Sequence, residues 1–175
     1  EMGYSEYCIS VNISAIQLQQ PEFADKIMNI LAKNKLSPHY LVLEITETAF
    51  MDFTDIVKNN LKSLGEKGVK ISIDDFGIGY NSLKILQKSV VDSLKIDKTF
   101  TISIDANRLF INTIISLGHQ INAAIVAEGV ETEKQYEYLK EQGCDMVQGY
   151  YFSKPLLPGE VLEFIKNCSQ KFFYY

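Results

Sequence analysis

The chain has 175 residues, of which 46% are hydrophobic and 22% are charged, so it can bury a sizeable core and is not a disordered chain. Its net charge is −5, from 22 acidic and 17 basic residues, and Arg108 is the one arginine in the sequence. We therefore expect no binding to duplex nucleic acid, because surfaces that follow phosphate backbones are basic and rich in arginine. A small anionic substrate is compatible with this charge if a metal ion or a lysine neutralises it locally.

The three cysteines, Cys8, Cys144 and Cys168, form no close pair and leave one odd residue, which is typical of a reduced, cytoplasmic setting. The sequence has no uninterrupted apolar run of about 18 residues, the length that a membrane helix needs. Its first six residues lack the basic start and the apolar run of a signal peptide. We expect a cytoplasmic domain.

Short apolar runs alternate with segments of helical periodicity along the chain. The runs are rich in Ile and Val and are short enough for buried parallel strands. They cover residues 8–14, 41–47, 69–75, 93–97, 124–131 and 146–152. Between them, apolar stripes at helical spacing comprise Phe23, Ile27, Ile30 and Leu31, then Ile56, Val57, Leu61 and Leu64, then Leu109, Ile114, Leu117 and Ile121.

The expected helix boundaries carry their own signals. Pro21 suits a first helical turn, and Gly68 and Gly143 suit the positions just after a helix. Thr132 and Gln135 have the spacing of a capping box. The sequence therefore predicts a strand followed by a helix, repeated about six times.

This alternation predicts an α/β fold with a parallel sheet, either an open doubly wound sheet or a closed TIM-type (β/α)8 barrel. Every predicted strand carries a polar side chain at or near its C-terminal end. Barrels draw their sites from many strand ends, whereas open sheets concentrate ligands at one switch point, so we favour the barrel. A complete barrel typically needs about 250 residues, and we expect about six of its eight βα units here.

One polar residue per predicted strand forms the candidate site: Asn12, Glu44, Asp74, Lys95, Glu128 and Gln148. Their separations of 32, 30, 21, 33 and 20 residues fit one helix and one strand between successive positions. Carboxylate and amide oxygens without thiolates or clustered histidines favour a hard cation such as Mg²⁺ or Mn²⁺. His39 and His119 are far apart in the sequence and are expected to be surface or helix residues.

Asp74 and Asp75 are the most specific feature of this set. On a regular strand two adjacent carboxylates point to opposite sides, but at a strand terminus each could hold a metal, or both could bridge two. The alternative is a pair that caps the following turn. Phe76, Gly77 and Gly79 follow directly and predict a loop that can pass close to a ligand.

Lys95 and Asp97 share one face of their predicted strand because they are two residues apart. A lysine in a barrel mouth must be paired or functional, since burying an unpaired ammonium is very costly. Its possible roles are a Schiff-base nucleophile, a group that orients water and stabilises negative charge, or a structural ion pair with a neighbouring carboxylate. Spacing alone does not choose among them.

Two glutamate pairs, Glu44 with Glu47 and Glu128 with Glu131, are each three residues apart. On a strand the two members of such a pair have opposite orientations, so one can face the barrel centre while the other contacts a loop. Either pair alone is also compatible with simple helix capping.

Taken in order, six of these stretches resemble the EAL family of cyclic di-GMP phosphodiesterases. The matching segments are VNIS at 11–14, EITE at 44–47, DDFGIGY at 74–80, LKID at 94–97, AEGVET at 127–132 and QGYYFSKP at 148–155. The resemblance implies a metal-dependent hydrolase that opens cyclic di-GMP to linear pGpG in bacterial second-messenger signalling. It also implies two divalent ions, Mg²⁺ or Mn²⁺, and a homodimer.

The resemblance assigns roles residue by residue. It makes Asn12, Glu44, Asp74, Asp75 and Glu128 metal ligands. Lys95, Glu128 and Gln148 would be the catalytic residues: Glu128 would bind the second metal, and Lys95 and Gln148 would hold or polarise the attacking water and its surroundings. Glu47 would brace the loop containing Phe76, Gly77 and Gly79, which in the family borders the dimer interface, and Asp97 and Glu131 would support the site.

Two departures from the family pattern accompany this match. Ile78 stands where the family's loop usually has Thr, and the E-x-L motif of the first strand, which supplies a metal ligand, is absent before Asn12. We therefore expect residues 1–175 to form an EAL-type phosphodiesterase domain that is incomplete at its N-terminus and hydrolyses poorly by itself. The parent protein could carry preceding sensor, diguanylate cyclase-type or membrane-anchoring segments.

The alternatives come from other functional classes. One is a catalytically inactive cyclic di-GMP receptor or scaffold, and the other is an unrelated metal-assisted hydrolase or a Schiff-base aldolase. The presence of every expected carboxylate from Asn12 onward favours the phosphodiesterase over the receptor.

Overall fold

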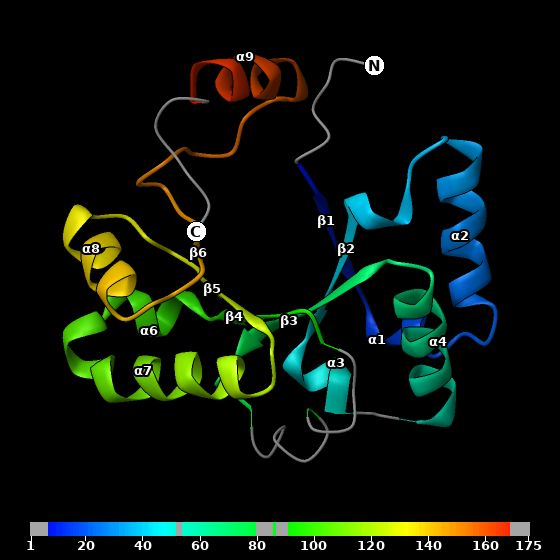
Figure 1. Ribbon diagram of the computed structural model, residues 1–175, viewed down its shortest axis with the longest axis horizontal. Helices are drawn as coiled ribbons and strands as arrows, with labels where there is room; N and C mark the ends of the chain where they lie inside the picture. The colour runs from blue at the N-terminus through cyan, green and yellow to red at the C-terminus, as the bar shows by residue number, and fades with distance from the viewer. Residues whose placement is uncertain (1–6, 52–53, 80–85, 87–90, 169–175) are drawn as a thin grey trace.

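In the part of the chain that the structure describes, six parallel strands form one sheet, and their spatial order is their order in the chain (Figure 1). The computed structural model describes residues 7–51, 54–79, 86 and 91–168. The strands are β1 (Ile9–Ile13), β2 (Leu41–Thr46), β3 (Lys70–Phe76), β4 (Ser93–Ile96), β5 (Ala124–Ala127) and β6 (Met146–Val147). A doubly wound sheet reverses direction part-way and therefore departs from chain order, whereas a barrel winds in one direction. The prediction of a barrel-type α/β fold with six βα units is confirmed, and β1 and β6 are the two edges of the sheet.

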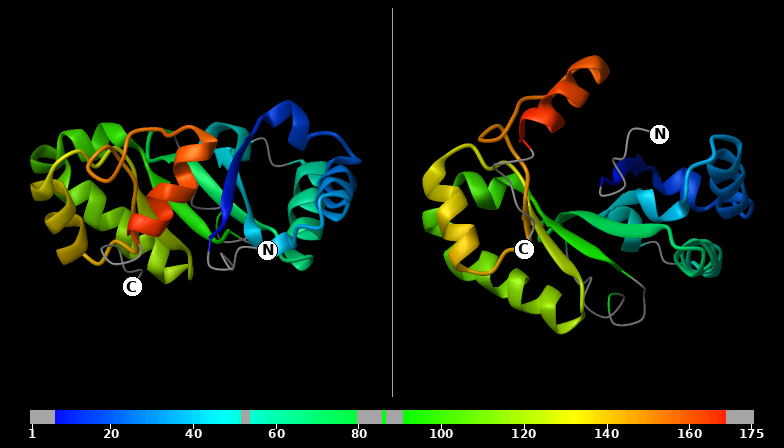
Figure 2. Two further views of the ribbon diagram at one scale, coloured as in Figure 1. Left: turned by 90° about the horizontal axis from the view of Figure 1, so that it is seen from above. Right: turned by 45° about the horizontal axis from the view of Figure 1, so that its top comes forward.

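Helices connect the strands and lie around the outer side of the curved sheet, except α9, which follows β6 and stands away from the sheet (Figure 2). They are α1 (Ala15–Leu18), α2 (Phe23–Lys33), the 3₁₀ helix η1 (Pro38–Tyr40), α3 (Glu47–Met51), α4 (Asp55–Glu66), α6 (Lys98–Ile102), α7 (Ile104–Gln120), α8 (Glu133–Glu141) and α9 (Pro158–Cys168). Among the residues with described placement, no helix combines the length and the apolarity needed to cross a bilayer.

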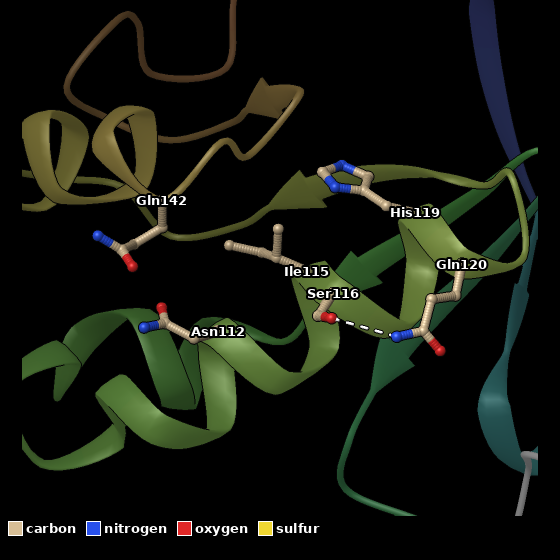
Figure 3. A pocket seen from close by; sticks show the side chains of 6 residues that line it. All are labelled: Asn112, Ile115, Ser116, His119, Gln120 and Gln142. Atoms are coloured by element: carbon tan, nitrogen blue, oxygen red, sulfur yellow. Dashed lines mark hydrogen bonds between the residues drawn. The ribbon is translucent and has the colours of Figure 1, made fainter.

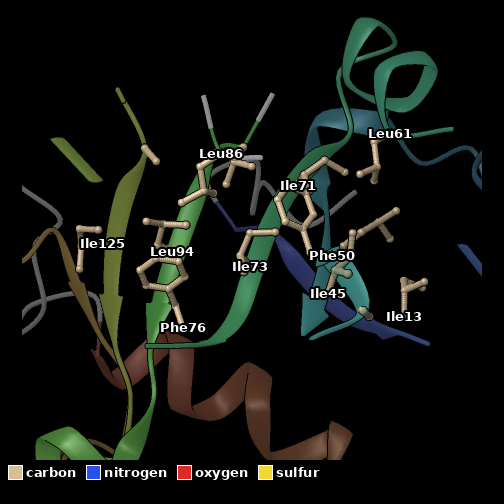
Figure 4. Packing of buried hydrophobic residues seen from close by; sticks show 14 of the residues in the cluster. Ile13, Ile45, Phe50, Leu61, Ile71, Ile73, Phe76, Leu86, Leu94 and Ile125 are labelled. Carbon is tan, nitrogen blue, oxygen red and sulfur yellow. The ribbon is translucent and has the colours of Figure 1, made fainter. Parts of the chain in front are cut away.

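The two faces of the sheet differ in chemistry. Alternate strand residues pack against the helices and are almost completely buried, as Figure 4 shows for Ile45, Ile71, Ile73, Leu94 and Ile125. The residues between them point to the inner side, because side chains alternate along a strand. The inner side therefore carries the polar positions, and the apolar core lies between the sheet and its helices.

Several predicted helix signals are confirmed. Thr132 and Gln135 form a capping box at the start of α8, and Gly68 and Gly143 follow α4 and α8 with positive φ angles of 91° and 78°. Pro21, however, lies in the turn before α2, whose N-cap is Glu22.

Three members of the predicted apolar stripes are exposed instead of buried: Ile30 (57%), Ile56 (41%) and Leu109 (83%). A helix on the outside of a barrel contacts the sheet along one narrow line. Positions at the margin of the stripe therefore stay in solvent.

The last two predicted strands are shorter in the structure. β5 ends at Ala127 because the chain turns at Gly129, which has a φ angle of 68°. β6 comprises two residues, although the backbone N–H of Gln148 still donates to the carbonyl oxygen of Ala127 at 2.8 Å.

Candidate functional site

The ammonium group of Lys95 contacts carboxylates from three other parts of the sheet. Its Nζ lies 2.8 Å from Glu44 Oε2, 3.1 Å from Asp74 Oδ1 and 2.6 Å from Glu128 Oε1. The four side chains come from β2, β3, β4 and the residue after β5, and each is between 5% and 18% exposed. The inner side of the barrel, near the C-terminal strand ends, therefore holds a compact cluster of charges.

Asp75 joins this cluster through an irregularity in β3. The register between β3 and β4 shifts between Ile73 and Phe76, and Asp75 has a positive φ angle of 55°. A bulge of this kind turns a side chain that would otherwise point to the opposite face. Carboxylate oxygens of Asp74, Asp75 and Glu128 consequently lie within 4.8 Å of one another. The adjacent aspartates thus converge on one site.

The donor atoms of this group fit a hard divalent cation. Oxygen ligands from several carboxylates are the set that Mg²⁺, Mn²⁺ and Ca²⁺ accept, and a partly buried position limits competition from water. Asp74, Asp75 and Glu128 suit such an ion because their ligand atoms are oxygens and because these oxygens converge on one position.

The environment shifts three pKa values in this cluster. Burial disfavours the charge of Lys95, but hydrogen bonds to Glu128 and Glu44 outweigh it and raise the pKa of Lys95 above its usual value. Burial raises the pKa of Glu128 against the effect of Lys95. Burial, together with the neighbouring charges of Asp74 and Asp97, raises the pKa of Asp75. The crowded carboxylates therefore favour a nearby positive charge.

Glu47, the first residue of α3, fixes the loop that follows the aspartates. Its Oε2 accepts hydrogen bonds from the backbone N–H groups of Gly77 and Gly79, both at 3.0 Å, and the residue is 3% exposed. Gly77 has a φ angle of 104°, and a Cβ at Gly79 would lie 2.8 Å from Glu47 Cδ. Phe76 is the last residue of β3 and is buried in the core, not part of the loop. Tyr80 lies outside the described residues.

Asp97 is the N-cap of α6 and is 5% exposed. Its Oδ1 accepts hydrogen bonds from the backbone N–H of Thr99, at 2.8 Å, and from the Thr99 hydroxyl. Since Asp97 also raises the pKa of Asp75, its carboxylate lies beside the cluster while it caps the helix.

Asn12, Gln148 and Glu131 are exposed. Asn12 is the register partner of Glu44, so both side chains lie on the same side of the sheet. The backbone N–H of Gln148 donates to the carbonyl oxygen of Ala127, and its carbonyl oxygen accepts from the N–H of Val130. The backbone N–H of Glu131 donates to Gln135 Oε1 in the capping of α8. The contacts of the structure therefore do not link these three side chains to the charge cluster.

The sequence interpretation missed a buried hydroxyl pair beneath the cluster. Ser93 Oγ donates to Ser72 Oγ at 2.8 Å, and each serine lies two residues before Lys95 or Asp74 on the inner side. The available signal was a small polar residue within a run of Ile and Leu.

A surface groove between α7 and α8 has a volume of about 530 Å³ and is separate from this cluster (Figure 3). Its lining consists of neutral side chains and His119, which lies 2.9 Å from Asp145. The lining residues are Asn112, Ile115, Ser116, His119, Gln120 and Gln142. The groove therefore lacks the carboxylates on which the candidate site depends.

Comparison with known proteins identifies the family. The sequence model of the EAL domain matches residues 2–155. The chain belongs to the EAL domain family. It is 39% identical over 163 residues to the bifunctional diguanylate cyclase/cyclic di-GMP phosphodiesterase MucR of Pseudomonas aeruginosa, covering 91% of this chain and 24% of MucR.

Solved EAL structures share the fold. The PaMucR phosphodiesterase in complex with c-di-GMP superposes with a TM-score of 0.86 and 38% identity, over 91% of this chain and 66% of that chain. Klebsiella pneumoniae BlrP1 in complex with manganese and cyclic di-GMP gives a TM-score of 0.79 and 28% identity, over 86% of this chain and 40% of that chain. The present EAL chain spans about a quarter or less of the length of the first curated relatives it matches.

Proposed function

We propose that residues 1–175 belong to an EAL-type phosphodiesterase domain that hydrolyses cyclic di-GMP to linear pGpG with the help of two divalent ions, Mg²⁺ or Mn²⁺. The observation that carries the proposal is the convergence of Asp74, Asp75 and Glu128 around a position beside Lys95. Family membership supports it, as do the c-di-GMP and manganese named for the neighbouring structures.

In this proposal Glu44, Asp74, Asp75, Glu128 and Asn12 hold the ions. Bound divalent ions would lower the pKa of water and offset charge on a phosphodiester, which an acidic chain needs in order to accept an anionic substrate. The register of Asn12 with Glu44 places both on the side of the sheet where the cluster lies.

The chain's own side chains supply the remaining functions. Lys95 places its positive charge at the cluster, where it would stabilise negative charge on the reacting phosphate, and Glu128 and Gln148 would orient the attacking water. Glu47 keeps the Gly77–Gly79 backbone in place beside Asp75, so that this carboxylate stays aimed into the site. Asp97 and Glu131 would support the strand ends that carry Lys95 and Glu128.

The geometry disfavours the Schiff-base alternative. A lysine nucleophile must lose its proton, and enzymes that use one lower its pKa. Here three carboxylates surround Lys95 and raise its pKa.

The four carboxylates of the cluster are also all present, which favours an enzyme over the inactive receptor.

Exposed apolar side chains at and near the Gly77–Gly79 loop favour a second copy of this chain as a partner. Ile78 is 57% exposed and Phe110 is 47% exposed, and Phe110 stacks on Phe100 at 4.8 Å between ring centroids. Such side chains tend to be covered in an assembly. Light scattering coupled to size exclusion tests the homodimer, and loss of the dimer in Ile78→Asp together with Phe110→Asp would support this surface.

Enzyme assays with variants test the proposed function. The product of the complete reading frame that contains this chain is incubated with cyclic di-GMP and Mg²⁺ or Mn²⁺. Asp74→Asn and Asp75→Asn should each remove hydrolysis, because a neutral amide cannot replace a carboxylate at a divalent ion. Asp55→Asn, on the outer helix α4, is the matched control. Near-normal hydrolysis by either cluster variant would contradict the two-ion assignment.

A further inference from the structure

Carboxylates of the candidate site surround the ammonium group of Lys95. An ammonium group has three protons, and Nζ lies within 3.1 Å of oxygens from three carboxylates. The Lys95 side chain is 5% exposed, so water contributes little to its solvation. The ion pairs with Glu44, Asp74 and Glu128 are therefore the main compensation for burying this charge.

Two of these carboxylates also belong to the group suited to a cation. Asp74 and Glu128 contact Lys95 and, with Asp75, offer oxygens within 4.8 Å of one another. A cation bound there would share carboxylates with the ammonium group and lie close to a like charge. The interaction between such charges is strong in a partly buried site.

We propose that Lys95 is a built-in counter-ion of the acidic cluster: it holds Glu44, Asp74 and Glu128 together before a divalent ion binds, and it competes with that ion for Asp74 and Glu128. This inference rests on the proposed function only in taking the cluster to be a divalent-cation site. It adds to that function a control of cation affinity by a residue of the chain.

The charge balance gives two consequences. Glu44, Asp74, Asp75 and Glu128 carry four negative charges and Lys95 carries one positive charge, which leaves −3 at the cluster. Replacing the lysine by a neutral residue makes the cluster −4. The metal-free chain should then lose stability because its buried carboxylates repel one another, while a divalent ion should bind more tightly.

The test measures Mn²⁺ affinity and metal-free stability in the 175-residue chain, by titration calorimetry and thermal unfolding. Lys95→Gln removes the charge and keeps hydrogen-bond donors. Lys95→Arg keeps the charge, and Lys58→Gln removes one charge from an exposed position on α4. We expect Lys95→Gln to bind Mn²⁺ about tenfold more tightly or better, with a lowered metal-free melting temperature. Lys58→Gln should match the wild type in both measurements, and Lys95→Arg should bind no more tightly than the wild type.

Unchanged or weaker Mn²⁺ binding by Lys95→Gln would overturn the inference, as would tighter binding by Lys95→Arg. If the wild type binds no Mn²⁺, the cation site of the proposed function fails for the wild-type chain. Binding by Lys95→Gln alone would still support competition by the lysine. Absence of binding in both proteins would overturn the inference. If Lys95→Gln is unfolded without metal, its circular dichroism is followed as Mn²⁺ is added. Recovery of the fold would support the inference, and no recovery would overturn it.

Discussion

Replacing Glu47 with alanine should release the loop that follows Asp75 and destabilise the chain. One oxygen of the buried Glu47 carboxylate accepts the N–H groups of both Gly77 and Gly79 at 3.0 Å. Hydrogen bonds to charged groups contribute about 1.5–3 kcal/mol each, and an unpaired buried donor costs about 1–3 kcal/mol. Gly79 is exposed, so water can satisfy its N–H after the substitution.

The two bonds together give an expected loss of about 3–6 kcal/mol for Glu47→Ala, and hydration of the exposed Gly79 N–H avoids a further penalty at that position. Glu47→Gln keeps an acceptor oxygen without the charge and should cost about half as much. For a chain of this size, each kcal/mol lowers the melting temperature by about 2–4 °C. Urea unfolding measures the free energy, and amide hydrogen exchange at Gly77 and Gly79 measures the release of the loop directly.

Glu66→Ala is the matched control, because Glu66 is an exposed glutamate at the end of α4 with a surface ion pair to Lys62. Its effect should stay within about 0.5 kcal/mol. A Glu47→Ala chain with wild-type stability and unchanged exchange at both glycines would refute the reasoning.

Three further predictions concern other parts of the described structure. Burial and two neighbouring carboxylates raise the pKa of Asp75 in the folded chain. The protonated carboxyl should therefore stabilise the metal-free chain below the ordinary carboxyl pKa, and this stabilisation should be lost as the pH rises through the pKa of Asp75 in the folded state. Asp75→Asn should remove this pH dependence, as measured by urea unfolding from below the ordinary carboxyl pKa up to neutral pH. Gly149→Ala should cost about 1–3 kcal/mol, because its Cβ would lie 2.1 Å from the backbone oxygen of Val130. Burial raises the pKa of Cys144 to about 12, so at mildly alkaline pH a disulfide reagent should label the exposed Cys8 well before Cys144, as read by mass spectrometry.

Each of these has a contrary outcome. Equal pH profiles of wild type and Asp75→Asn would show that this carboxyl does not couple to folding. Gly159→Ala, where a Cβ meets nothing within 4 Å, is the control for Gly149→Ala, and equal stability of the two variants would remove the proposed clash. Simultaneous labelling of Cys8 and Cys144 would contradict the burial of the second thiol.

The sequence predicted the order of the strands and most of the charge cluster because these depend on local patterns. Apolar runs mark strands, and the C-terminal ends of parallel strands meet on one side of a barrel. Glu44, Asp74, Lys95 and Glu128 therefore had to approach one another. The distances among these side chains depend on the register of the strands, which the sequence does not give. The same register decides that Lys95 is ion-paired, a role that spacing alone could not select.

The bulge at Asp75 could not be predicted from the pattern of the sequence. Aspartate tolerates positive φ better than most residues, but a shift of register is decided by the fit between β3 and β4. The shortness of β6 has a similar origin, since Gly149 packs against the backbone of Val130 and turns the chain away. Both are consequences of tertiary packing.

The most direct test of the account is the conversion of cyclic di-GMP by the product of the complete reading frame, followed by liquid chromatography and mass spectrometry. The account predicts linear pGpG in the presence of Mg²⁺ or Mn²⁺, no product after chelation of the metal, and none from Asp74→Asn. Intact cyclic di-GMP under all metal conditions, with a folded protein, would contradict the assignment of the cluster to phosphodiester hydrolysis.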